Sequence, residues 1–195
     1  MFGLYITHPQ VLIDPKAPVP DWGLSETGLA RTRQAASLPW ARQLCRIVSS
    51  EERKAVETAE ILAEAAGIAP QTHATMHEND RSATGFLPPP AFEQAADWFF
   101  ANPQESFRGW ERAVDAQARI VAAVSEALID HDPTLPIAFV GHGGVKCHLA
   151  SRAISRDRDQ PGGGGNLFAF HLSRSLAECR LACDWTPMEF WQGDM

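Results

Sequence analysis

The sequence contains no hydrophobic run of the roughly 18 residues that a membrane-spanning helix needs, so we expect no membrane contact. Its first residues also lack the basic segment followed by an apolar stretch that is typical of a secretion signal, which favours a cytoplasmic protein. The 195 residues include only 17 Lys and Arg against 24 Asp and Glu. The resulting net charge of −7 argues against nucleic acid as the main partner.

Cysteine is also scarce, with four residues at positions 45, 147, 179 and 183. None of them forms a Cys-x-x-Cys pair, and no group of Cys and His has the spacing of a zinc site. Cys179 and Cys183 could share one face of a helix, but ordinary reduced thiols are the simpler interpretation. We therefore expect neither a metal site nor a cofactor.

Short apolar runs alternate with longer amphipathic segments along the chain, which is typical of βαβ units and a mostly parallel sheet. We predict a single domain over residues 1–195, an α/β fold with three α/β/α layers around that sheet. The predicted strands are Gly3–Thr7, Arg46–Ser49, Thr72–Glu78, Ile137–Gly141 and Asn166–Leu172, and the predicted helices are Glu26–Ser37, Glu51–Ala66, Ala91–Ala101, Trp110–His131 and Gly144–Ser155.

Local signals mark the ends of some of these elements. Ser49 and Glu52 have the spacing of a capping box at the start of the second helix, and Gly67 follows that helix as a C-terminal cap would. Prolines or glycines predict irregular structure in three segments, namely Pro15–Trp22, Ser82–Pro90 and Asp157–Gly165.

Two histidines follow predicted strands from opposite ends of the sequence. His8 comes directly after the first strand, and His142 lies in the run Gly141-His142-Gly143-Gly144. Ligands of open α/β sheets bind beyond the carboxyl ends of the strands, so both histidines are expected in one site. The glycines would let the backbone approach an anion at the start of the next helix. The alternative is a strand-to-helix turn that simply needs glycine.

Charged residues follow the other predicted strands. Lys54 lies in the first turn of the second helix, near enough to the sheet edge to reach a phosphate, whereas Arg53 is expected to face solvent. Glu78, at the end of the third strand, is a candidate general acid. The alternatives are a solvated first turn for Lys54 and a surface carboxylate for Glu78.

These residues resemble the histidine phosphatases, also called the phosphoglycerate mutase-like superfamily. The family's Arg-His-Gly motif corresponds to Thr7-His8-Pro9, and its Leu-Ser/Thr-x-x-Gly stretch corresponds to residues 24–28. Residues 49–59 match the family's serine-rich motif, with Lys54 in place of its arginine. A family glutamate falls on Glu78, and residues 141–145 match the second histidine motif without gaps.

The resemblance implies a metal-independent phosphatase of the histidine acid phosphatase type. His8 would become a phosphohistidine, Glu78 would donate a proton to the leaving oxygen, and His142 and Lys54 would hold the phosphoryl oxygens. The implied partner is a small phosphorylated molecule or a phosphoprotein. A phosphoglycerate mutase is a less favoured interpretation, because that branch resembles longer chains with additional loops.

Two departures from the family weaken the expected anion site. At Thr7, a hydroxyl that can donate one hydrogen bond stands where the family has a charged arginine. At Lys54, a single ammonium charge stands where the family has a planar guanidinium that can donate two parallel hydrogen bonds. Losing one such donor typically costs about 3–4 kcal/mol of transition-state stabilisation. Arg81, three residues after Glu78, is our candidate to compensate, with Gly143 as a further phosphate contact. The alternative function is an impaired pseudophosphatase that binds a phosphorylated or acidic ligand.

The segment around residues 79–110 is expected to form a lid, and its aromatic residues favour a substrate with an apolar portion or a protein partner. Core packing would explain the same aromatics. Glu111 and Arg119 are expected to serve as scaffold, and His77 and His148 to pack rather than act. The aromatic C-terminal residues Trp185, Phe190 and Trp191 are expected either to cover the core or to form a homodimer contact.

Overall fold

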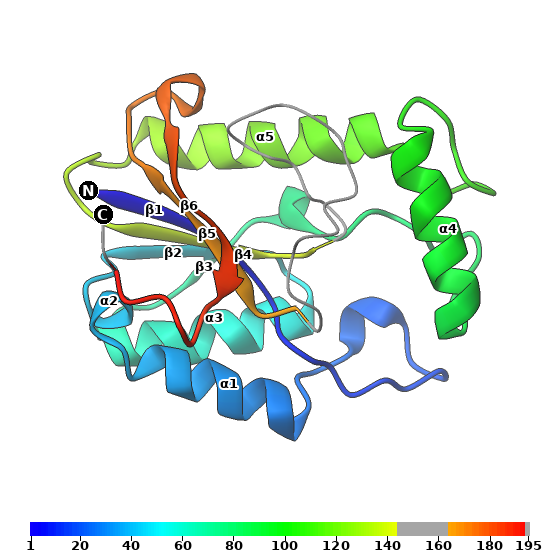
Figure 1. Ribbon diagram of the computed structural model, residues 1–195, viewed down its shortest axis with the longest axis horizontal. Helices are drawn as coiled ribbons and strands as arrows, with labels where there is room; N and C mark the ends of the chain where they lie inside the picture. Colours follow the sequence, from blue (N-terminus) through cyan, green and yellow to red (C-terminus); the bar gives the residue numbers. More distant parts are fainter. Residues whose placement is uncertain (144–163, 194–195) are drawn as a thin grey trace.

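The computed structural model describes residues 1–143 and 164–193, and its centre is a six-stranded sheet (Figure 1). The strands are β1 (Phe2–Thr7), β2 (Arg46–Ser49), β3 (Gln71–Thr72), β4 (Ile137–Gly141), β5 (Asn166–His171) and β6 (Arg180–Pro187). Their order in the sheet is β3-β2-β4-β1-β5-β6. The first four of these run parallel, whereas β5 is antiparallel to both β1 and β6. The predicted mostly parallel α/β sandwich is therefore confirmed.

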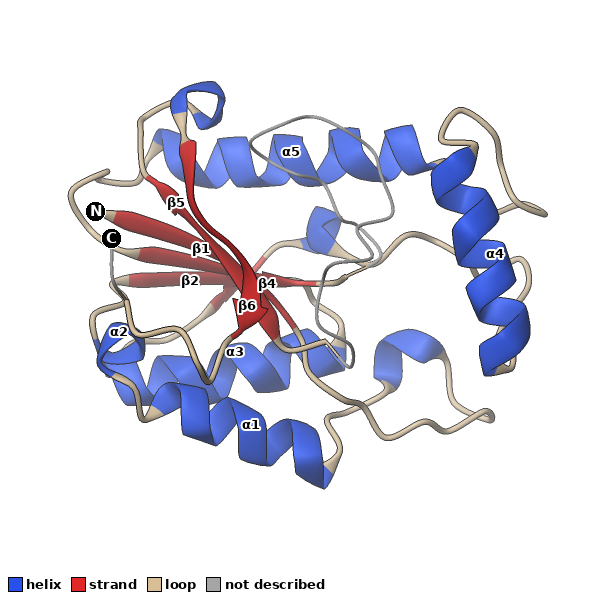
Figure 2. Ribbon diagram, in the orientation of Figure 1, coloured by secondary structure: helices blue, strands red, loops and turns tan. Residues whose placement is uncertain are grey.

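Helices cover both faces of the sheet (Figure 2). The helices α1 (Glu26–Ala36), α2 (Pro39–Arg42) and α3 (Arg53–Ala66) lie on one face, and α5 (Ala113–Ile129) lies on the other. Side chains of β1 alternate between the two resulting cores, with Leu4 and Ile6 in the first and Tyr5 in the second. No helix in the described part of the chain is long and apolar enough to cross a bilayer.

Helix α4 (Pro89–Ala101) stands apart from the sheet, at the end of the molecule opposite the chain termini (Figure 1). Its buried residues Ala95 and Phe99 pack with Trp110 and Ala113 in a small cluster separate from the two sheet cores. Residues 79–110 thus have an apolar centre of their own, which explains most of their aromatic content.

The third predicted strand is wrong beyond its first residue. β3 ends at Thr72, and a short 3-10 helix follows at Ala74–Met76. The guanidinium of Arg119 accounts for the difference. It donates hydrogen bonds to the carbonyls of Thr75 and His77, which would bond to a neighbouring strand if β3 continued. The chain therefore turns away from the sheet before it reaches Glu78.

Other boundaries also differ from the prediction. α3 begins at Arg53 with Glu52 as its N-cap residue and has no side-chain cap, so the predicted capping box is wrong, whereas the Gly67 cap is confirmed by its φ of 70°. α5 begins three residues later than predicted, because the N–H of Glu111 bonds to the carbonyl of Asp80 in the preceding loop. β6 was not predicted, since all of its residues are exposed or half-buried at the sheet edge.

Several predictions fall on the C-terminal quarter. One predicted helix lies outside the described residues, namely Gly144–Ser155 with Cys147 and His148. Most of the segment Asp157–Gly165 lies outside them as well. Cys179 and Cys183 are free and do not share a helix, because Cys183 lies in β6. Trp191 is buried against Phe2 and Trp40, and Trp185 packs on Phe168. Trp185 and Trp191 therefore cover the core, whereas Phe190 is exposed.

Candidate active site

Three neighbouring strands deliver the central residues of the site. Thr7 at the end of β1 pairs with Gly141 at the end of β4, and the N–H of His8 bonds to the Gly141 carbonyl at 3.0 Å. Ser50, directly after β2, donates its N–H to Val140 of β4 at 2.9 Å. The next residue after β4 is His142, and its ring centroid lies 5.2 Å from that of His8. The sheet thus brings the two predicted histidines together.

His8 has a defined protonation pattern. Its Nδ1 donates a hydrogen bond to the carbonyl of Pro9 at 2.8 Å, which leaves the lone pair on Nε2. Burial lowers the pKa of His8 to about 4, with the Lys54 and Arg81 charges acting in the same direction. The imidazole is therefore neutral at physiological pH and presents a nucleophilic nitrogen.

A glycine turn before β5 holds the backbone of His8. The N–H of Gly165 bonds to the His8 carbonyl at 2.9 Å. Gly164 has a φ of +67°, and a Cβ there would lie 2.4 Å from the same carbonyl oxygen, so only glycine fits. Arg31 donates to the Gly164 carbonyl at 2.9 Å and forms an ion pair with Glu189 at 2.6 Å. Neither residue was predicted, because no local pattern connects positions so far apart in the sequence.

His142 is fully buried, and its two ring nitrogens have different surroundings. Nε2 lies 2.9 Å from the Ser50 hydroxyl, which already accepts the N–H of Glu52 at 3.2 Å. A hydroxyl oxygen can accept two hydrogen bonds, so the imidazole proton of His142 can lie on either Nε2 or Nδ1. Nδ1 has no hydrogen-bond partner among the described residues, and it lies 4.0 Å from a carboxylate oxygen of Glu78. Burial lowers the pKa of His142 well below its usual value.

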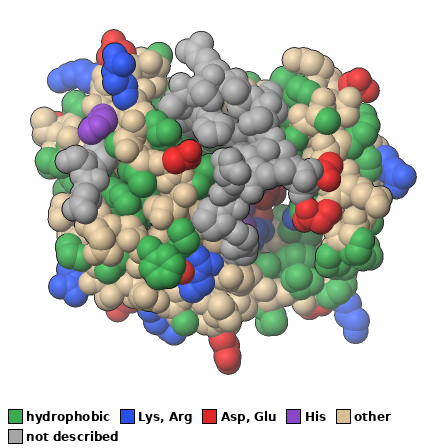
Figure 3. All heavy atoms as spheres, viewed as in Figure 1, with side chains coloured by type: hydrophobic (Ala, Val, Ile, Leu, Met, Phe, Trp, Pro, Cys, Tyr) green, Lys and Arg blue, Asp and Glu red, His purple; other side chains and the backbone are tan. Residues whose placement is uncertain are grey.

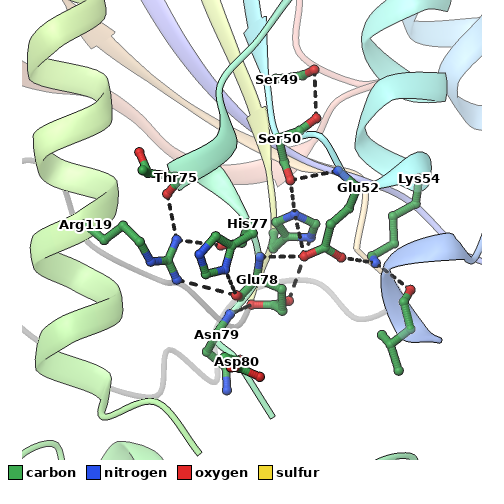
Figure 4. Close-up of polar contacts among 12 residues, drawn as sticks. Ser49, Ser50, Glu52, Lys54, Thr75, His77, Glu78, Asn79, Asp80 and Arg119 are labelled. Atoms are coloured by element: carbon green, nitrogen blue, oxygen red, sulfur yellow. Dashed lines mark hydrogen bonds and ion pairs between the residues drawn. The ribbon is translucent and has the colours of Figure 1, made fainter. Parts of the chain in front are cut away.

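Glu78 lies in the loop after the short 3-10 helix, and its side chain is 14 % exposed. Its backbone N–H donates a hydrogen bond to Glu52 Oε1 at 2.7 Å (Figure 4). The guanidinium of Arg119 donates a hydrogen bond to the carbonyl of the preceding residue, His77, at 2.9 Å. Arg119 itself pairs with Glu111 at 2.7 Å, in agreement with the expected scaffold role. Burial raises the pKa of Glu78, although the Arg81 charge acts in the opposite direction. The carboxyl group therefore keeps its proton to a higher pH than an exposed one.

Lys54 does not point freely into the site. Its ammonium contacts the Glu52 carboxylate and donates to the Val19 carbonyl at 3.0 Å (Figure 4). Both side chains are buried, so part of the lysine charge is neutralised before any ligand arrives. Glu52 was not predicted as a site residue, because its spacing from Ser49 indicated a helix cap.

The remaining predicted residues occupy different places. The Thr7 hydroxyl donates to the Asn166 carbonyl at 3.2 Å and accepts the N–H of Asn166 at 3.0 Å, so both of these hydrogen bonds are made to backbone and not to a charged group. Gly143 follows His142 and is half-buried. Arg53 extends outward, as predicted, with a side chain that is 64 % exposed. The Arg81 guanidinium stacks over Phe92, with Cζ 4.7 Å from the ring centroid.

A cleft of about 810 Å³ lies beside this group. Glu52, Glu78 and Arg81 line it, together with His77, which therefore faces the cleft rather than only packing beneath it. Ligand atoms of His8, Glu78 and His142 all lie within 4.8 Å of one another. Two imidazoles and a carboxylate can hold a transition metal, and with the carboxyl protonated the same three groups suit a phosphoryl group.

Comparison with known proteins identifies the family of the chain. The model of the histidine phosphatase superfamily (branch 1) matches residues 17–163. The chain belongs to the histidine phosphatase superfamily. The family and the fold predicted from the sequence are thereby confirmed.

Solved structures of histidine phosphatase-like proteins cover almost the whole chain. Mycobacterial glucosyl-3-phosphoglycerate phosphatase in complex with inorganic phosphate is 23% identical, with a TM-score of 0.71, and the match covers 96% of this chain and 98% of that one. Bacillus stearothermophilus YhfR is 18% identical, with a TM-score of 0.76 and coverage of 94% and 96%. No curated protein matches the chain in sequence. These likenesses show the shared fold.

Proposed function

We propose that the protein is a phosphomonoester hydrolase that works through a phosphohistidine on His8. The observation that carries the proposal is the pairing of a neutral His8, whose Nε2 carries the lone pair, with a carboxyl group of raised pKa on Glu78. Membership of the histidine phosphatase superfamily and a structural neighbour described as a phosphatase support the same reaction class.

The first half of the reaction transfers the phosphoryl group to the protein. His8 Nε2 attacks phosphorus in line, so a P–N bond forms as the ester P–O bond breaks. The Glu78 carboxyl gives its proton to the departing alcohol oxygen, which neutralises the developing charge on it. In the proposed tautomer, His142 accepts the Ser50 hydroxyl hydrogen at Nε2 and carries its own proton on Nδ1. That Nδ1–H, which lacks a partner among the described residues, is suited to donate to a phosphoryl oxygen.

The second half returns the protein to its starting state. The Glu78 carboxylate takes a proton from a water molecule as the water oxygen attacks phosphorus. A P–O bond forms, the P–N bond breaks, and His8 leaves with its lone pair on Nε2. The products are inorganic phosphate and a reprotonated Glu78, so the cycle balances.

Cationic side chains are proposed to replace a metal in this reaction. Lys54 is paired with Glu52, whereas Arg81 forms no ion pair with any described residue. Arg81 is therefore the stronger candidate to hold the phosphoryl oxygens. Its charge acts on the pKa of His8, Glu78 and His142, which indicates that it lies near all three.

A binding function without turnover is the second candidate, and the Glu52–Lys54 pair favours it. The Glu52 carboxylate lies beside Lys54, which stands in place of the family's arginine, and this weakens the attraction for an anion. Such a protein would bind a phosphorylated or acidic ligand in the same cleft but transfer no phosphoryl group.

The two functions are separated by an aryl phosphate assay with a chelator present. We expect the wild-type protein to release phosphate in EDTA and the variant His8→Asn to lose at least about 10⁴-fold in kcat. A protein that gains thermal stability with inorganic phosphate but shows no turnover would be a binding module. Activity that disappears with EDTA and returns with a divalent metal would contradict the metal-independent mechanism.

A further inference from the structure

A second, smaller pocket of about 200 Å³ adjoins the cleft. Val19, Arg81, Gly85 and Phe86 line both cavities, so the two cavities adjoin at these residues. The guanidinium of Arg81, stacked over Phe92, therefore marks the junction between the proposed phosphate site and the smaller pocket. The walls of the smaller pocket are formed mainly by apolar residues, namely Ile13, Val19, Trp22, Leu87, Pro89, Phe92 and Trp110.

Large apolar side chains remain exposed where this pocket opens. Ile13 is 54% exposed and Phe86 is 37% exposed, and both line the pocket. Phe86 contacts Trp22 edge to face, with ring centroids 5.9 Å apart, so the pocket has an aromatic rim. The space-filling view shows hydrophobic side chains on the α4 side of the hollow (Figure 3). Apolar surface gathered around a concave site indicates that a ligand covers it.

The charges around the cleft point to a ligand with few negative groups. Described acidic residues in its lining outnumber the basic ones, and acidic side chains border the hollow in Figure 3. Glu78 is protonated in the proposed mechanism and Glu52 is paired with Lys54, whereas Asp21, Glu51 and Asp80 form no ion pair with a described residue. A second anionic group on the ligand would be repelled by these three carboxylates at the rim. The acidic lining residues are Asp21, Glu51, Glu52, Glu78 and Asp80, and the basic ones are Lys16, Arg53 and Arg81.

From these observations we infer that the substrate is a phosphomonoester of an uncharged alcohol that carries an aryl or alkyl group. The inference rests on the proposed function. The phosphoryl group would sit beside His8 and Arg81, and the apolar group would fill the pocket between Phe86 and Phe92. Covering these side chains would release water from apolar surface on both the ligand and the protein.

Three primary alkyl phosphates with similar leaving groups test the inference. We expect kcat/KM for 3-phenylpropyl phosphate to exceed that for propyl phosphate by about 10- to 100-fold, the gain from burying most of a phenyl ring. We expect 3-carboxypropyl phosphate to be a poorer substrate than propyl phosphate. Equal values for the phenyl and propyl esters, or a preference for the carboxylate, would overturn the inference.

Two phenylalanine variants localise the effect. Phe86→Ala is expected to remove most of the advantage of the phenyl ester over the propyl ester. Phe190→Ala deletes an aromatic ring that is 65% exposed and lines neither cavity, so it should leave the ratio unchanged. A ratio that falls equally in both variants, or in neither, would place the apolar site elsewhere and refute the pocket.

A binding experiment separates this inference from the proposed function. Propylphosphonate and 3-phenylpropylphosphonate cannot be hydrolysed, and calorimetry measures their affinities without turnover. Tighter binding of the phenyl compound by the wild-type protein, together with no hydrolysis of any ester, would support the pocket and refute the phosphatase. Hydrolysis of all esters with equal affinity for both phosphonates would support the phosphatase and refute the pocket.

Discussion

The floor and the wall of the site are built differently. The floor consists of His8, Ser50, Glu52, Lys54 and His142, which follow the ends of β1, β2 and β4 or begin α3, and its backbone is tied to the sheet. The wall consists of residues 80–110, which pack around their own apolar cluster. Glu78 lies between the two, with its backbone N–H bonded to the floor residue Glu52.

We infer that the floor carries out the chemistry and that the wall selects the substrate. A floor fixed by strand hydrogen bonds holds reacting groups at constant distances, which proton and phosphoryl transfer require. A wall with a separate apolar cluster and few ties to the sheet can vary in shape without disturbing the sheet core. Changes in the floor should therefore lower the rate for every substrate, and apolar changes in the wall should alter the choice among substrates.

After His8→Asn, the largest expected effect is that of Glu78→Gln. The amide cannot donate the carboxyl proton, so we expect kcat to fall by about 10²- to 10⁴-fold with phenyl phosphate. The loss should be smaller with 4-nitrophenyl phosphate, because its leaving group departs without a proton. The exposed variant Glu105→Gln provides a matched control, since its side chain lies outside the cleft. Equal losses with both esters would show that Glu78 is not the proton donor.

The pH dependence gives the same test a second readout. His8 must be neutral, so kcat/KM should fall as the pH drops through about 4, the pKa of that imidazole. Glu78 must be protonated, so the rate should also fall as the pH rises through its raised pKa. Glu78→Gln should keep the low-pH decline and lose the high-pH one. A high-pH decline that persists in the variant would assign it to another group.

A smaller effect is expected for Arg81→Ala, and it tests whether the wall contributes to the chemistry. Loss of the guanidinium should lower kcat/KM by about 10- to 100-fold for every phosphomonoester, because the transition state carries charge on the phosphoryl oxygens. Arg108 is a matched control in the same segment, exposed and 5.3 Å over the ring of Phe107. Arg108→Ala should have little effect. Equal activities of the two variants would confine phosphate binding to the floor.

Much of the floor could be predicted because its signals are local. Short apolar runs ending in His8 and His142 mark strand ends, and strand ends in a parallel sheet meet at one edge. Glu78 was expected from a strand that proved two residues long, yet it still reaches the site because Arg119 and Glu52 hold the loop. The position of Glu78 therefore depended on contacts that the local sequence does not show.

The remaining parts depend on tertiary contacts. The Glu52–Lys54 pair follows from the start of α3 at Arg53, two residues later than predicted, which turns the Glu52 carboxylate towards the site. Thr7 occupies the place of a charged family residue, but its hydroxyl bonds to the backbone of Asn166, which is distant in sequence. No pattern within a short stretch of sequence indicates such pairings.

Trapping the phosphorylated protein tests the central claim most directly. Rapid acid-free quenching of a reaction with an aryl phosphate, followed by mass spectrometry, should show one added phosphoryl group on His8. The modification should be labile in acid and stable in base, and it should be absent from His8→Asn. Phosphate release with the label on another residue, or turnover with no label under conditions that retain phosphohistidine, would contradict the account.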